Sequence, residues 1–224
     1  MNIVIEICVV IIITILSWIY FSIQDFKGEQ SLLSKIKNAL FNHKKRSLYF
    51  LVMMVALSGM AISLFMIYPS NTLVANLKLI VLCGLLFPIA AIDQVKKIIP
   101  NKIILVGLVL RVVFYFAELF TLGSGIFSII KGDLIACIIP VVFLLLGVFM
   151  FKNGIGMGDI KLLIIMCLFQ GITGAISSIF VSLLIAFIIS IALLISKKKG
   201  RKDAVPFAPS ILIGTYISII LTGM

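Results

Sequence analysis

The chain has 224 residues, of which 62% are hydrophobic and 12% are charged, and its formal net charge at pH 7 is +11. Soluble domains are roughly half apolar and about a quarter charged, so this composition excludes an ordinary soluble domain. Runs of about 20 apolar residues cross a bilayer as helices, and many such runs follow one another here. We therefore expect an all-α fold, a polytopic transmembrane helical bundle.

The apolar runs predict about eight membrane segments in chain order. These segments span roughly residues 3–23, 48–68, 73–92, 102–120, 133–151, 159–170, 173–195 and 207–223. The sixth is short for a full crossing, and Gly171 and Gly174 interrupt the apolar pattern after it. The sixth and seventh segments are therefore either two spans or one long kinked helix.

The positions of the basic residues predict the orientation. Sixteen of the 19 lysines and arginines lie in four connections, at 24–47, 93–102, 152–161 and 196–203. With eight crossings these connections share one side, which the positive-inside rule assigns to the cytoplasm. The excess positive charge then faces anionic lipid headgroups, so we expect no binding of nucleic acid.

Residues 1–74 are predicted to form an N-terminal pair of transmembrane segments joined by a basic cytoplasmic loop. Apolar residues at near-helical spacing within 25–47 suit a short helix in the headgroup region. The chain has no C-x-x-C pair, and its cysteines all lie inside apolar runs, so we expect neither a zinc site nor a disulfide framework. These cysteines are Cys8, Cys83, Cys137 and Cys167.

Carboxylates are rare in this chain and costly at membrane depth. Glu6 and Glu118 lie near segment ends on the outer side, where we expect them to reach the interface. Asp133 follows Gly132 at the start of a predicted segment and is interpreted as a helix N-cap. Asp93 and Asp159 differ from these three carboxylates, because both are predicted at the cytoplasmic boundary of the membrane.

Asp93 ends the third segment in FPIAAIDQVKKIIPNK, and Asp159 opens the sixth in NGIGMGDIKLL, 66 residues later. Two carboxylates at one depth can share a proton and activate water, as an aspartyl protease requires. The neighbouring glycines would leave room for a substrate backbone. Helix dipoles favour charge on Asp159, at a helix start, and a proton on Asp93, at a helix end. The structural alternative is an N-cap at Asp159 and local pairing of Asp93 with lysines.

The segment GMGDIKL at 156–162 resembles the G-x-G-D signature of the type IV prepilin peptidases, a family of membrane aspartyl proteases. AAID and IIPN within 91–101 are similar to that family's first aspartate and the turn after it, and VPFAPSILIG at 205–214 is similar to its closing segment. The resemblance covers roughly residues 75–224. It implies that Asp93 and Asp159 are catalytic. The other motif residues are Gly156, Gly158, Pro100, Asn101, Lys161, Pro206 and Pro209.

The resemblance implies an aspartic endopeptidase of the bacterial cell membrane. Its partners would be prepilin or pseudopilin leader peptides, cut at the cytoplasmic face by water without a metal or cofactor. Many relatives carry a methyltransferase region with paired C-x-x-C motifs, which residues 1–74 lack, so methyl transfer is not expected. An open alternative is a presenilin-like or signal-peptide-peptidase-like protease, although Ile92 stands where those enzymes typically have Tyr. A second open alternative is a non-enzymatic transporter or assembly scaffold. The sequence does not predict the oligomeric state.

Overall fold

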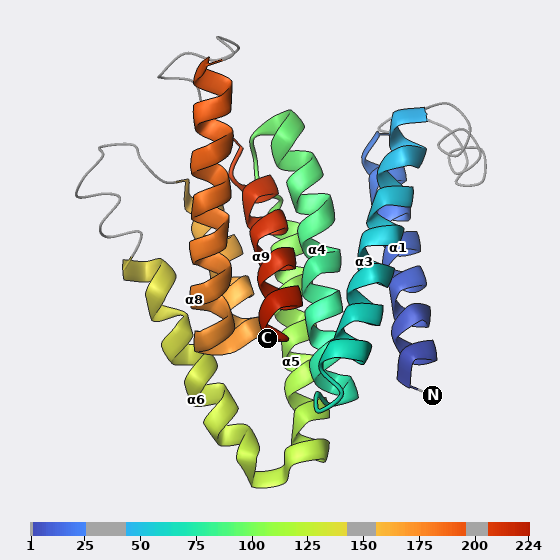
Figure 1. The fold of residues 1–224 in the computed structure, drawn as a ribbon, viewed down its shortest axis with the longest axis vertical. Coiled ribbons are helices and arrows are strands. Elements are labelled where there is room, and N and C mark those ends of the chain that lie inside the picture. The colour runs from blue at the N-terminus through green and yellow to red at the C-terminus, as the bar shows by residue number, and fades with distance from the viewer. Residues whose placement is uncertain (1, 26–43, 143–155, 196–205) are drawn as a thin grey trace. The chain divides into compact units, whose positions relative to one another are not determined.

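The computed structural model describes residues 2–25, 44–142, 156–195 and 206–224 (Figure 1). Nearly all of these residues are helical, and no strand occurs among them. The predicted all-α class is confirmed. The predicted headgroup helix within 25–47 lies almost wholly outside the described residues.

Seven α-helices and one 3₁₀ turn are assigned within the described residues. They are α1 (Asn2–Asp25), α3 (Lys44–Ile67), α4 (Leu73–Lys96), α5 (Asn101–Leu122), η1 (Gly123–Gly125), α6 (Ile126–Ala136), α8 (Met157–Ile195) and α9 (Ala208–Thr222).

Five stretches are long and apolar enough to cross a membrane, among the described residues. They are Asn2–Phe21, Ser47–Ile67, Leu73–Lys96, Asn101–Val142 and Met157–Leu193. The last two each combine more than one predicted segment, and α9 is shorter than the others. The helical bundle is therefore supported, whereas the count of about eight segments is not confirmed.

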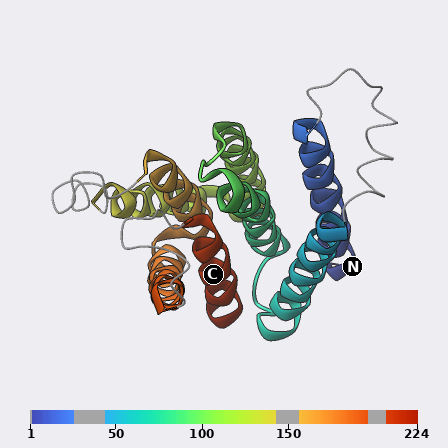
Figure 2. The same ribbon diagram turned by 90° about the horizontal axis from the view of Figure 1, so that it is seen from above.

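Helix α8 is interrupted at Gly171, whose φ of 67° and ψ of −170° are not helical. Positive φ is readily available only to glycine, which explains why the interruption predicted from the sequence falls here. Figure 1 shows the parts before and after Gly171 running in opposite directions, and Figure 2 shows them as separate helices. Residues 157–170 and 172–195 are thus two helical segments.

The contacts divide the chain within α4 into unit 1 (Met1–Gly84) and unit 2 (Leu85–Met224). In unit 1, α1 packs on α3, and the ring of Trp18 stacks on that of Phe50 with centroids 5.3 Å apart. The first part of α4 also lies close to α1, because a Cβ at Gly84 would lie 2.5 Å from a methyl group of Ile13.

Glu6 is buried in unit 1, where its Oε1 accepts a hydrogen bond of 2.9 Å from Nδ2 of Asn76. The prediction that Glu6 reaches the membrane interface is therefore wrong. Its partner lies on α4, 70 positions further along the chain, and the apolar pattern of α1 contains no sign of it.

A buried charged group, the Arg111 cluster, joins α5 to α6 in unit 2. It comprises Arg111, Tyr115, Glu118 and Asp133. Nη1 of Arg111 donates to Oε2 of Glu118 at 3.0 Å, and Nη2 donates to Oδ2 of Asp133. The hydroxyl of Tyr115 donates to the same Asp133 oxygen at 2.9 Å. Arg111 is only 1% exposed, so both of its ion pairs form away from solvent.

The Arg111 cluster corrects two expectations. Asp133 is not an N-cap, because α6 begins seven residues earlier at Ile126 and Asp133 lies in its interior. Glu118 does not reach the interface, because it is 4% exposed and its carboxylate pairs with Arg111. In both cases an ion-pair partner within the bundle replaces water.

The cluster yields a stability prediction. Arg111→Met leaves Glu118 and Asp133 buried without their cation, and breaking a buried pair in this way costs roughly 3–5 kcal/mol. We expect a clear fall in the thermal unfolding temperature of the purified protein in detergent. The uncharged triple variant Arg111→Met/Glu118→Gln/Asp133→Asn should recover most of that loss.

Lys131→Met is the matched control, because Lys131 is an exposed cation on α6, and its unfolding temperature should stay near that of the unmodified protein. An Arg111→Met variant as stable as this control would show that the cluster does not hold the helices together.

Candidate active site

Asp93 lies in the last turn of α4, and its side chain is 5% exposed. The helix ends because the chain leaves it through Lys97, whose φ is 52°, while the N–H of Lys97 still donates to the carbonyl of Asp93 at 2.9 Å. Oδ2 of Asp93 accepts a buried hydrogen bond of 3.0 Å from the backbone N–H of Ala208. Asp93 is therefore held between the end of α4 and the start of α9.

Asp159 lies in the first turn of α8 and is half-buried. Its backbone N–H donates to the carbonyl of Gly156 at 3.0 Å, which forms the turn that opens the helix. A Cβ at Gly156 would lie 3.0 Å from Oδ2 of Asp159. The glycine thus keeps side-chain atoms away from this carboxyl group.

Burial disfavours negative charge on the carboxyl group of Asp159, and the charge of Asp93 adds to this effect. The two aspartates belong to helices far apart in the sequence, yet they interact electrostatically at one end of unit 2. Like charges brought together in this way favour sharing one proton. Their catalytic role stays a prediction.

The turn between α4 and α5 lies against the start of α8. A Cβ at Gly158 would lie 3.0 Å from Cβ of Ile99, which is closer than ordinary van der Waals contact, so glycine at this position permits the approach without a shift of Ile99. Nζ of Lys161 donates to Oδ1 of Asn101 at 3.1 Å on the exposed side of the same contact. Pro100 is the N-cap of α5, with φ of −74° and ψ of 116°. The IIPN turn and the GMGDIKL segment therefore touch through Ile99 and Asn101.

The closing motif forms the beginning of α9. Pro206 and Pro209 are half-buried, and Pro209 lies in the first helical turn, directly after Ala208. Figure 1 shows the end of α4 close to the starts of α5 and α9 at one end of unit 2. The structure thus brings all three sequence motifs to the same region.

Two contacts in this region could not be predicted from the sequence. The N–H of Ala208 is a backbone donor, so no residue type marks it, and Ile99 is identified only by its contact with Gly158. The chemistry available is that of carboxyl groups, amides and lysines. Within the described ranges, no group of three or more His, Cys, Asp or Glu residues is arranged to hold a metal ion.

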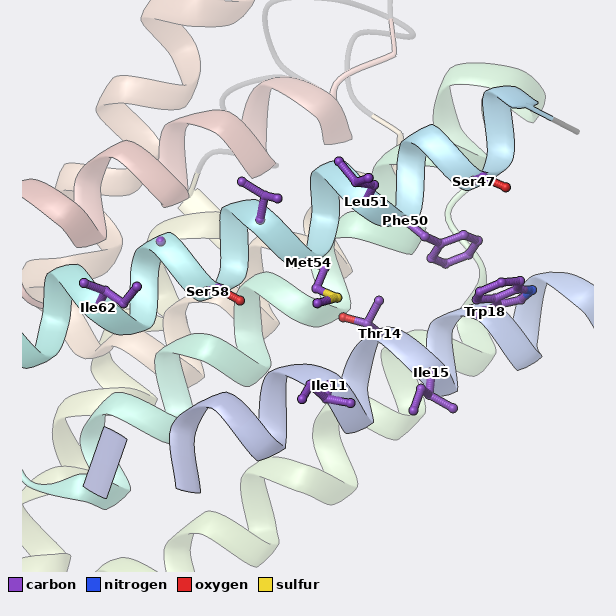
Figure 3. Close-up of a pocket in the computed structure, with 12 residues that line it drawn as sticks. Ile11, Thr14, Ile15, Trp18, Ser47, Phe50, Leu51, Met54, Ser58 and Ile62 are labelled. Carbon is purple, nitrogen blue, oxygen red and sulfur yellow. The ribbon is translucent and has the colours of Figure 1, made fainter. Parts of the chain in front are cut away.

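Unit 1 contains a groove of its own (Figure 3). It runs between α1 and α3 and is almost entirely apolar. Its lining residues are Ile11, Thr14, Ile15, Trp18, Ser47, Phe50, Leu51, Met54, Val55, Ser58, Gly59 and Ile62. None of them belongs to the three motifs, and none is acidic, so the groove offers no group for acid–base chemistry.

Comparison with known proteins places the chain in a family. A sequence model described as the type IV leader peptidase family matches residues 80–194, just over half of the chain. The match includes Asp93 and Asp159 and ends before the closing motif. Neither the search of curated proteins nor that of solved structures gave a match. On the extent of the family match, with its membrane-type apolar helices, the chain belongs to the type IV leader peptidase family.

Proposed function

We propose that this peptidase is an aspartyl endopeptidase that cleaves the leader peptides of type IV prepilins or pseudopilin-like substrates. One observation carries the proposal: Asp93 of α4 and Asp159 of α8 interact at the same end of unit 2. The glycine motif, the Ile99–Asn101 turn and the start of α9 surround them there. This is the arrangement that a two-carboxylate protease needs.

The chemistry requires water and one proton shared by the two carboxyl groups. The ionised carboxylate takes a proton from water as the water oxygen bonds to the scissile carbonyl carbon. The protonated carboxyl gives its proton to the carbonyl oxygen, which produces a neutral gem-diol. When the C–N bond breaks, the first carboxyl passes its new proton to the leaving nitrogen, and the second regains one from a gem-diol hydroxyl.

We assign the site to the cytoplasmic face of the cell membrane. Exposed lysines gather at this end of unit 2, at Lys96, Lys97, Lys102 and Lys161. The positive-inside rule places such residues in the cytoplasm. A leader peptide lying there could reach the dyad while the apolar helix that follows it remains in the bilayer. Residues 1–74 are assigned no methyl-transfer activity.

Removing either carboxylate should abolish cleavage. Asp93→Asn and Asp159→Asn keep the side-chain shape but cannot transfer protons, so we expect each to lower the cleavage rate by about a hundredfold to ten-thousandfold. The measurement is the size shift of a co-expressed prepilin with a short basic leader that ends in Gly.

Glu6→Gln is the matched control, because Glu6 is a buried carboxyl group outside the site and Gln can still pair with Asn76. It should cleave at the rate of the unmodified enzyme. Retained cleavage in either aspartate variant would refute the dyad. Mass spectrometry of the product separates the alternatives, since a cut inside the apolar helix would indicate a presenilin-like enzyme and no cut would indicate a scaffold.

Gly158→Ala tests the close approach of the motifs. Its Cβ would lie 3.0 Å from Cβ of Ile99, so Ile99 and the start of α8 must separate by a few tenths of an ångström, which displaces Asp159 relative to the turn after Asp93. Small misplacements of catalytic groups are costly, and we expect kcat/KM to fall on the order of tenfold.

Gly132→Ala on α6 is the control for the glycine change, because its Cβ would meet nothing within 4 Å. Equal kcat/KM values in the two variants would show that the contact between Gly158 and Ile99 does not position the site.

A further inference from the structure

The groove in unit 1 lies between two helices that are long and apolar enough to cross a membrane. Helices α1 and α3 contain the apolar stretches Asn2–Phe21 and Ser47–Ile67, and the groove between them has a volume of about 650 Å³. Sites for small ligands have volumes of about 300–1,000 Å³. The lining side chains of Ile15, Leu51 and Val55 are at least half exposed, so a ligand can enter the groove from the side.

The length and the lining of the groove suit one acyl chain of a lipid. The lining extends along α3 from Ser47 to Ile62, which is about 22 Å at 1.5 Å per residue. One leaflet has a hydrocarbon thickness of about 15 Å, half that of the whole bilayer core. An acyl chain that enters at the Ser47 end therefore meets apolar side chains of both helices as far as the middle of the bilayer.

The Ser47 end of the groove differs from the rest in its charge. Figure 3 shows Ser47 and Trp18 at this end. The first three residues of α3 are KKR, at 44–46, and they directly precede Ser47. The dipole of a helix also favours negative charge at its start. Along α1 the acidic residue nearest to Trp18 is Asp25, seven positions further on, so positive charge predominates at this end.

Trp18 adds a hydrogen-bond donor to the same end. Its Nε1 is buried and has no hydrogen-bond partner within the described part of the chain, while its ring stacks on that of Phe50. Buried Trp N–H groups usually have an acceptor, and Trp residues of membrane proteins are enriched at the level of the lipid headgroups. A ligand oxygen at this end of the groove would supply that acceptor.

We infer that the groove binds one anionic phospholipid, with an acyl chain between α1 and α3 and the phosphate group beside Trp18 and residues 44–46. The site is additional to the proposed peptidase activity and does not rest on it. By the positive-inside rule the charged end lies in the cytoplasmic leaflet. Anionic lipids of that leaflet attract basic segments next to membrane helices.

Charge complementarity favours a lipid over the other occupants of such a groove. The proposed substrate has a basic leader, which residues 44–46 repel. A second copy of the chain in the same orientation brings its own basic run to the same level. Residues 26–43 contain three lysines and one acidic residue, so this connection is also basic. A lipid phosphate carries the opposite charge, and like charges across an interface are costly.

The unmodified full-length protein tests the inference without any substitution. After removal of lipid in a non-ionic detergent, phosphatidylglycerol and phosphatidylcholine with the same acyl chains are titrated separately, and native mass spectrometry gives the Kd of the first bound lipid. Phosphatidylglycerol should bind about tenfold more tightly or better, because each basic residue near a headgroup contributes a factor of about five. Equal Kd values for the two lipids would overturn the inference.

K44Q/K45Q/R46Q removes the charge at the end of the groove. The Kd for phosphatidylglycerol should rise about tenfold or more and approach the Kd for phosphatidylcholine, which should change little. The measurement is the same titration by native mass spectrometry.

K197Q/K198Q/K199Q is the matched control, because it removes the same charge from the basic connection at 196–203. Its Kd for phosphatidylglycerol should equal that of the unmodified protein. Equal weakening in both triple variants would show attraction to the total charge of the protein rather than to this site, and would contradict the inference.

Ser58→Leu tests the apolar part of the groove. Ser58 lines the groove between its two ends (Figure 3), so a leucine there occupies the space of the acyl chain. The Kd should rise about tenfold for both lipids, because losing the burial of even two CH₂ groups has this effect. Val52→Leu is the control, since Val52 is an exposed residue of α3 outside the lining, and its Kd values should not change.

Other occupants give different results. Lipid binding that Ser58→Leu leaves unchanged would place the lipid outside the groove and overturn the inference. A higher KM for prepilin cleavage in Ser58→Leu, without a change in lipid binding, would assign the groove to the substrate helix. A change from dimer to monomer in that variant, again with lipid binding unchanged, would assign it to a second copy of the chain. Either result would replace the lipid.

Discussion

A carboxylate buried among apolar helices is costly unless a donor or a cation meets it, and this constraint governs the protein. Glu6 has Asn76, Glu118 and Asp133 have Arg111, and Asp93 has the N–H of Ala208. Asp159 has the backbone of Gly156 as a hydrogen-bond partner, but it differs from the others because the charge of another carboxylate also acts on it. An arrangement that places two like charges together contributes nothing to stability, and it is here that we place the chemistry.

One helical segment links the two charged regions of unit 2. Residues 157–170 of α8 begin at the Asp159 turn and end at Gly171, where a Cβ would lie 3.3 Å from Oδ1 of Asp133. At 1.5 Å per residue the two ends of this segment are about 20 Å apart. The Arg111 cluster is therefore suited to fix one end of the segment, while Asp159, the residue proposed to be catalytic, lies at the other. A helix that is fixed at its far end in this way holds a catalytic group in a constant position.

Much of the fold was predictable because the length of apolar runs and the positions of charges are local properties of the sequence. The all-α class, the interruption at Gly171 and a common level for Asp93 and Asp159 followed from them. Partnerships between helices did not, because they depend on which faces meet. Asp133 shows the difference: a preceding glycine suggested a helix start, yet α6 begins at Ile126 and Asp133 pairs with Arg111. The Ala208 donor was hidden for a simpler reason, since a backbone N–H is the same in nearly every residue.

The central claim is that Asp93 and Asp159 face each other closely enough to share a proton, and cysteine cross-linking in native membranes tests it most directly. Asp93→Cys/Asp159→Cys would be made with the four native cysteines replaced by serine, beside Asp93→Cys/Gly132→Cys as the distant control pair. The account predicts a rapid bridge by a short dithiol cross-linker in the first pair and none in the control. Failure of the 93–159 pair to cross-link, or equal cross-linking of both pairs, would contradict it.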